Sequence, residues 1–182
     1  MLPRSGFLQR APIVSVVPPP DLAWTLRWLL RNPESLEFGS VVRMPDWLRM
    51  LSLDVDDSAH MATLHAQSPL ANITRMNRPL LVAGGKDRRV GIAGVIEYAA
   101  RLKLANKDVS LLVETDAGHA NREPIAREAN LYLMETMLHR HLGGPAPAAP
   151  DLASRRYLID SLRLCHRDLQ AVCAKDWVAD VR

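Results

Sequence analysis

Apolar residues in this chain form short continuous runs that alternate with longer stretches of helical spacing. Three runs rich in β-branched residues and leucine fit strands buried on both faces: Ile13–Val17, Leu80–Ala83 and Val109–Val113. Elsewhere apolar positions recur every three to four residues, which predicts helices. The predicted helices are one capped by Asp21 and ended by Asn32-Pro33, short ones at Pro45–Leu51 and Ala59–Leu64, and long ones at Ile92–Leu104 and Arg122–Leu142. Strands separated by helices of ten or more residues predict a parallel sheet with right-handed crossovers.

Glycine pairs and side-chain spacing refine these elements. Gly84-Gly85 is expected to turn the chain sharply after the second strand, and Gly143-Gly144 to end the last long helix. Within Ile92–Leu104, the spacing predicts one apolar side, formed by Val95, Ala99, Ala100 and Leu102. The fold class predicted is therefore α/β, with a parallel sheet of about three strands flanked by helices.

The segment Pro145–Pro150 (PAPAAP) breaks this order and predicts an extended linker. Residues 1–144 then form the α/β part and residues 151–182 a helical tail. Beyond the linker a 4-3-4-3 spacing predicts one apolar stripe on a C-terminal helix, formed by Leu158, Leu162, Cys165, Leu169 and Val172. Because the stripe lasts only about two heptads, packing on its own domain is favoured over a dimer zipper.

Composition limits the class of protein. The chain has 182 residues, 48% of them apolar, which suits one globular domain. Its net charge of +3 is dispersed and no basic run is interleaved with aromatics, so a nucleic-acid partner is not expected. The apolar run Ala11–Pro20 is too short to span a membrane and ends in three prolines, so a buried strand is favoured over a secretory signal and no membrane partner is expected.

The two cysteines, Cys165 and Cys173, lie eight residues apart in the predicted C-terminal helix. A helix would hold their Cα atoms roughly 12 Å apart, too far for a disulfide between them. Free thiols of this kind indicate a cytoplasmic protein, although an intermolecular bridge stays open.

Asp87 and His119 are the candidate catalytic residues. Asp87 lies four residues beyond the strand end at Ala83, and His119 six residues beyond Val113. Carboxyl ends of parallel strands meet at one edge of a sheet, so neighbouring strands would bring the two side chains together. A carboxylate can then fix the tautomer of an imidazole that removes the proton of a serine nucleophile. The alternatives are a helix N-cap for Asp87 and a solvated surface residue for His119.

Four motifs carry a resemblance to a known family. They are Ser68-Pro69-Leu70, the strand Arg78-Pro79-Leu80-Leu81, Gly85-Lys86-Asp87-Arg88-Arg89-Val90, and Asp116-Ala117-Gly118-His119. In this order, the stretch from roughly Phe7 to Gly144 resembles the carboxyl-terminal part of the catalytic domain of the prolyl oligopeptidase family, whose members are α/β-hydrolases and serine peptidases. The resemblance implies a partial α/β-hydrolase fold in which Asp87 is the acid and His119 the base of a Ser-Asp-His triad. It also implies hydrolysis of a peptide or related acyl bond.

The nucleophile of such a triad is missing from these residues. No Gly-x-Ser-x-Gly is present, and Ser5, Ser15 and Ser40 lack the strand and turn that would expose a nucleophile. The hypothesis is therefore a serine-type peptidase fragment that does not turn over substrate alone. The alternative is an inactive product or interaction module that self-associates through an exposed sheet edge or its C-terminal helix.

No cofactor or metal is expected. The cluster of Asp54, Asp56, Asp57, His60 and His65 lacks a His-x-x-x-His spacing, so a solvated acidic loop is favoured over a metal site.

Overall fold

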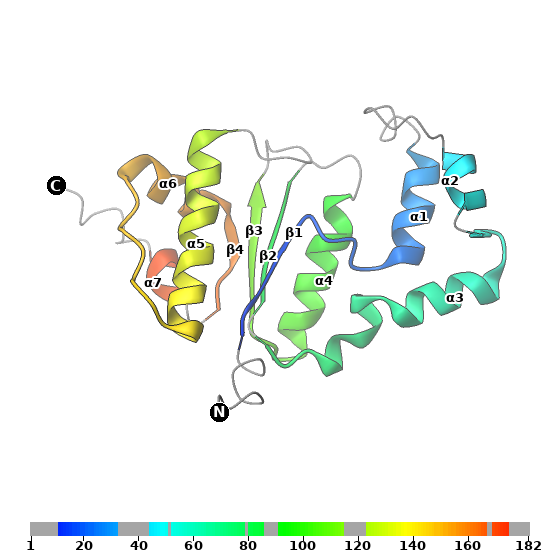
Figure 1. The fold of residues 1–182 in the computed structure, drawn as a ribbon, viewed down its shortest axis with the longest axis horizontal. Coiled ribbons are helices and arrows are strands. Elements are labelled where there is room, and N and C mark those ends of the chain that lie inside the picture. The colour runs from blue at the N-terminus through cyan, green and yellow to red at the C-terminus, as the bar shows by residue number, and fades with distance from the viewer. Residues whose placement is uncertain are drawn as a thin grey trace, which may run out of the picture.

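A mixed β-sheet forms the centre of the molecule (Figure 1). The computed structural model describes residues 11–32, 44–50, 52–78, 80–85, 91–114, 123–166 and 169–174. Within these ranges the sheet has four strands in the order β1 (Ile13–Val16), β2 (Leu80–Gly85), β3 (Val109–Glu114) and β4 (Leu162–Leu164). The first three are parallel, as predicted, whereas β4 runs antiparallel to β3 and was not predicted.

Helices cover both faces of this sheet (Figure 1). The helices are α1 (Leu22–Arg31), α2 (Met44–Met50), α3 (Ser58–Gln67), the 3-10 helix η2 (Pro69–Arg75), α4 (Ile92–Leu104), α5 (Pro124–Leu142), α6 (Leu152–Ser161) and α7 (Gln170–Cys173). Figure 1 shows α5, α6 and α7 on one side of the sheet, and α4 on the other with α1 and α3 beyond it. The boundaries of the helices predicted before residue 145 are confirmed to within a few residues, and those of α4 match the prediction at both ends.

Alternation along the strands produces two separate clusters of buried side chains. Successive residues of a strand point to opposite faces of the sheet. The cluster on the α4 face joins Leu70, Leu80, Val95, Tyr98, Ala99, Leu102, Val109 and Leu111. The cluster on the α5 face joins Leu81, Ala83, Leu112, Ala129, Leu133, Met137, Leu158, Leu169 and Val172. Ala100 is exposed, so its predicted place on the buried side of α4 was wrong; its neighbour Ala99 is the buried residue.

Gly84 and Gly85 lie inside β2 rather than in a turn after it. They pair with Val113 and Glu114 of β3, so β2 is two residues longer than predicted. A Cβ atom added to Gly84 would lie 3.0 Å from Cδ1 of Ile92 and 3.3 Å from Cγ1 of Val95. Gly84 therefore allows α4 to approach the sheet closely, which is a packing role and not the turn expected from the sequence.

The region beyond residue 150 differs most from its prediction. The expected continuous helix is wrong, because α6 ends at Ser161 and the chain forms β4 before α7 begins. Its apolar residues nevertheless pack on their own domain, as predicted, since Leu158, Leu169 and Val172 are buried in the α5-face cluster.

This change of path brings the two cysteines together. Cys165 and Cys173 form a disulfide, with their Cα atoms 6.6 Å apart. The prediction of free thiols was therefore wrong, because it assumed one helix across both residues, and the expectation of a cytoplasmic protein loses its basis. None of the described helices is long and apolar enough to cross a membrane.

Candidate active-site edge and neighbouring pocket

The carboxyl ends of β2 and β3 lie side by side. The two strands are parallel neighbours, and Gly85 at the end of β2 is in register with Glu114 at the end of β3. Asp87 follows Gly85 by two residues, and His119 follows Glu114 by five. The adjacency of the two strands, which the sequence analysis left as a condition, is therefore met. Asp87 and His119 themselves lie outside the described residues, so their contact stays a prediction.

A buried carboxylate, Glu114, ends β3 just before the segment that carries His119. Glu114 is only 5% exposed. Its Oε1 accepts hydrogen bonds from the Tyr157 hydroxyl of α6 and from Nδ2 of Asn130 in α5, both at 2.8 Å. Because a buried carboxylate is costly without such donors, these two helices fix the end of the strand. The sequence analysis missed Glu114, although a charged residue ending the apolar run VSLLVE was a usable signal.

On the other side of the sheet edge, α1 packs against the start of α4. A Cβ atom on Gly91 would lie 3.0 Å from ring atoms of both Trp24 and Trp28, and one on Gly94 would lie 3.0 Å from Trp24. The two indole rings are stacked, with centroids 6.2 Å apart. The tryptophans therefore hold α1 against the first turn of α4.

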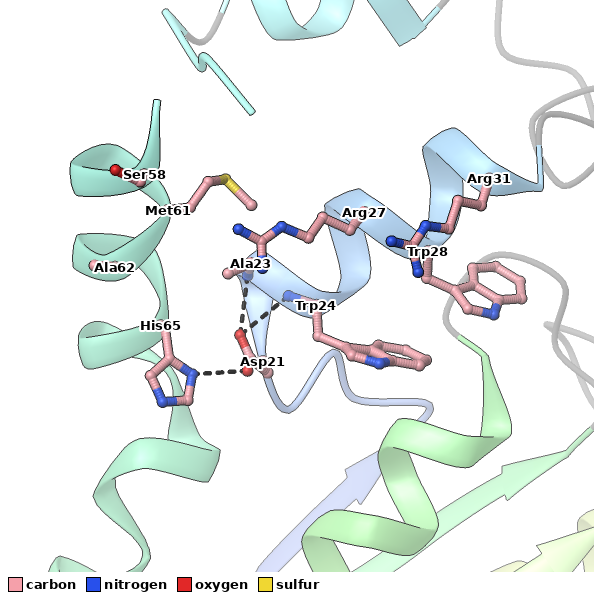
Figure 2. Close-up of a pocket in the computed structure, with 10 residues that line it drawn as sticks. All are labelled: Asp21, Ala23, Trp24, Arg27, Trp28, Arg31, Ser58, Met61, Ala62 and His65. Carbon is pink, nitrogen blue, oxygen red and sulfur yellow. Dashed lines mark hydrogen bonds and ion pairs between the residues drawn. The ribbon is translucent and has the colours of Figure 1, made fainter. Parts of the chain in front are cut away.

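A pocket of about 530 Å³ lies between α1 and α3 (Figure 2). Asp21 forms its floor and is 7% exposed. One oxygen, Oδ1, caps α1 as predicted by accepting from the backbone N–H groups of Ala23 at 3.0 Å and Trp24 at 3.2 Å. The other, Oδ2, lies 2.8 Å from Nδ1 of His65. An ionised carboxylate only accepts hydrogen bonds, so Nδ1 of His65 carries the proton.

Among the described residues that line the pocket, no serine completes a triad with Asp21 and His65. Ser58 lines the same pocket but lies seven residues from His65 on α3, roughly 10 Å along the helix axis. That separation exceeds hydrogen-bond reach. The sequence analysis found the capping role of Asp21 and missed its pairing with His65, which lies 44 residues away in the chain.

Ser68, the first residue of the Ser-Pro-Leu motif, connects the two helices of this pocket. It is fully buried. Its hydroxyl donates to the carbonyl of Leu64 at 2.7 Å and accepts from the N–H of Leu22 at 2.9 Å. Ser68 thus joins the end of α3 to the beginning of α1.

Two aspartates of the acidic cluster at residues 54–57 accept hydrogen bonds from backbone N–H groups. Asp57 caps α3 by accepting from the N–H groups of Ala59 and His60, and Asp54 accepts from the N–H of Asp56. Across the described ranges, no three His, Cys, Asp or Glu side chains are grouped so that they could hold a metal ion.

Comparison with known proteins decides the family. The family model described as "Prolyl oligopeptidase family" matches residues 43–144, more than half of the chain. The chain belongs to the prolyl oligopeptidase family. The matched range includes β2, α4 and β3, together with positions 87 and 119.

Two individual proteins that are similar to this chain are also peptidases by name. The "Dipeptidyl peptidase family member 6" of Caenorhabditis elegans is 30% identical over 100 residues, which cover 54% of this chain and 14% of that protein. The acylaminoacyl peptidase of Pyrococcus horikoshii is similar in structure, with a TM-score of 0.54 and 16% identity over 80% of this chain and 22% of the other. The structural match shows the fold, a partial α/β-hydrolase, as the sequence predicted. The chain thus spans a small part of either relative.

Proposed function

We propose that this chain supplies the acid and the base of a serine peptidase, with Asp87 as acid and His119 as base. The observation that carries the proposal is the pairing of Gly85 with Glu114, which brings two strand ends together just before these residues. In its complete form the protein would hydrolyse peptide or related acyl bonds. Membership of the prolyl oligopeptidase family supports this chemistry, and both relatives are named as peptidases.

Each residue would have a distinct role. The Asp87 carboxylate would accept a hydrogen bond from Nδ1 of His119 and hold the ring in one tautomer. Nε2 of His119 would then remove the proton of a serine hydroxyl as it attacks the acyl carbon, and later deliver that proton to the leaving amine. The buried Glu114 and its donors Tyr157 and Asn130 would fix the strand end from which the His119 segment departs.

These 182 residues hold no recognisable nucleophile elbow for such a triad. They contain no Gly-x-Ser-x-Gly, and Ser15 lies within β1 opposite Val82 rather than at a turn. Because a triad works as a unit, its acid and base alone give almost no rate.

Labelling with a fluorophosphonate tests the proposal. The chain alone is expected to remain unlabelled. A polypeptide extended upstream to include a Gly-x-Ser-x-Gly segment of the same reading frame is expected to be labelled and to cleave peptide substrates. Substituting His119→Gln in that protein should reduce labelling by at least about a thousandfold. Labelling of the 182-residue chain alone, or an extended protein indifferent to His119→Gln, would refute the assignment.

A second candidate function, self-association, is favoured by the edge of the sheet. Among the described strands β1 pairs with β2 alone, and Val16 on it is 58% exposed. An open strand edge is a template for pairing with another chain. Light scattering of the purified chain tests this candidate: a concentration-dependent dimer supports it, and a monomer across the accessible concentrations rules it out.

A further inference from the structure

The pocket between α1 and α3 has a chemistry that the catalytic proposal does not use. Its volume of about 530 Å³ lies within the range of small-molecule sites. The lining combines charged and apolar side chains: Asp21, Ala23, Trp24, Arg27, Trp28, Arg31, Ser58, Met61, Ala62 and His65. Figure 2 shows the two arginines extending from α1 beside the cavity, with Met61 and His65 on α3 opposite.

Arg27 and Arg31 bring two positive charges to this cavity. They lie four residues apart on α1, a spacing at which like charges destabilise a helix. Within the described part of the chain, neither guanidinium forms an ion pair. The one carboxylate that lines the pocket is Asp21, and its oxygens are engaged by the N–H groups of Ala23 and Trp24 and by His65. The arginine donors are therefore available to an anion from outside.

The contacts at the start of α1 argue against a phosphate that is held by backbone donors. Phosphate sites at a helix start use free backbone N–H groups. At the start of α1 those of Ala23 and Trp24 already donate to Asp21. A guanidinium can bind either a carboxylate or a phosphate through two parallel hydrogen bonds and needs no backbone donor, so the apolar lining decides between an organic carboxylate and a free phosphate.

The apolar part of the lining indicates what the carboxylate is attached to. Trp24 and Trp28 line the pocket as partly buried residues, although their rings also pack on the start of α4, and Met61, which is 2% exposed, faces α1 from α3. Aromatic faces of this size bind apolar and aromatic groups. We propose that this pocket binds a small carboxylate with an attached aromatic or apolar group, such as an N-acylated aromatic amino acid or the free carboxyl terminus of a short peptide. The site is independent of Asp87 and His119.

The proposal is tested by titrating the full 182-residue chain with N-acetyl-L-phenylalanine. Binding is measured by calorimetry and by the change in tryptophan fluorescence. The acid is expected to bind at least about tenfold more tightly than N-acetyl-L-phenylalaninamide, which lacks the carboxylate, because hydrogen bonds to a charged group are the strong ones. Inorganic phosphate is expected to bind more weakly than the acid. N-acetyl-alanyl-phenylalanine distinguishes the two sources: tighter binding of the dipeptide indicates a peptide terminus, and equal binding indicates a free amino-acid derivative.

Matched variants assign the binding to the pocket. Arg27→Gln/Arg31→Gln should weaken binding of the acid by about tenfold or more. Arg156→Gln/Arg163→Gln removes the same charge from exposed residues of α6 and β4, on the far side of the sheet, and should leave binding unchanged. Equal affinity for acid and amide overturns the proposal without any variant. So do tighter binding of phosphate, no binding of the acid, or an equal effect of the two double variants.

Discussion

The two faces of the sheet are built in different ways. On the α4 face, seven of the eight clustered residues come from one strand–helix–strand unit, β2, α4 and β3, within residues 80–111. On the α5 face, the cluster combines strand residues with α5 and with Leu158, Leu169 and Val172, which follow the proline-rich segment 145–150. The first face is therefore assembled by contacts close in sequence, whereas the second requires the end of the chain to return to the sheet. This difference predicts that the α5 face depends more strongly on the C-terminal segment than the α4 face, to which that segment adds the partly buried Leu164.

Leucine truncation on each face should have the largest effect. Leu102 on the α4 face and Leu158 on the α5 face are both fully buried, so alanine at either position should lower the free energy of unfolding by about 2–5 kcal/mol. Urea denaturation measures the loss, and Leu104→Ala, at a residue 87% exposed, is the matched control. Hydrogen exchange should show α6 and β4 opening first in Leu158→Ala while α4 stays protected. A loss for Leu158→Ala no larger than for Leu104→Ala would contradict the role of the C-terminal segment.

Removing the disulfide should have the next largest effect and should act on the α5 face. Cys165 follows β4 and Cys173 ends α7, so their bond holds Leu169 and Val172 near the sheet. For a loop this short, Cys165→Ala/Cys173→Ala should lower the free energy of unfolding by about 2–3 kcal/mol. A reductant should bring the wild-type chain to the level of the double variant and leave that variant unchanged. Wild-type stability that is insensitive to reductant would show that the bond does not contribute.

The Glu114 network should have a smaller effect. Tyr157→Phe removes one donor to a buried carboxylate and should cost about 1–2 kcal/mol in urea denaturation. Tyr98→Phe is the control on the α4 face, because the Tyr98 hydroxyl has no hydrogen-bond partner among the described residues and burial raises the pKa of its phenol. Phenylalanine there should be nearly neutral. Equal losses for the two variants would mean that the hydrogen bond to Glu114 adds nothing.

The smallest effect should be a pH dependence at the start of α6. Asp151 caps this helix, and hydrogen bonds from Ser154 hold the pKa of its carboxyl below the usual value. A lowered pKa in the folded state gives a stabilisation that is present above the unfolded value of about 3.9 and lost as the pH falls through the folded value. Asp151→Asn keeps a capping side chain but does not titrate. Its urea midpoint should therefore fall less than that of the wild type between about pH 5 and about pH 2, and parallel curves would contradict the assignment.

Sequence patterns predicted the α4 face well because its signals are local. The helix Ile92–Leu104 shows its period within its own residues, and the two strands beside it are continuous apolar runs. The strand β4 (Leu162–Leu164) was missed because it is only three residues long and its first residue, Leu162, also fits the predicted helical stripe. What makes these residues a strand is the free edge of β3, some fifty residues earlier, which no local pattern shows.

The candidate site residues likewise divide into those that local sequence patterns indicate and those that only tertiary packing brings together. Asp87 and His119 could be proposed because each follows a strand and the strands are neighbours in sequence as well as in the sheet. The pairing of Asp21 with His65, 44 residues apart, and that of Glu114 with Tyr157, 43 residues apart, depend on tertiary packing alone.

The most direct test of the central claim is the state of the His119 ring in solution. If Asp87 and His119 form a pair at the ends of β2 and β3, nitrogen-edited proton NMR should show a His119 Nδ1 proton protected from exchange with water. Asp87→Ala should abolish that signal and leave the backbone amide protons of the paired strands β2 and β3 unchanged as an internal reference. A His119 signal absent from the wild-type chain, or one that survives Asp87→Ala, would contradict the assignment of the acid and the base.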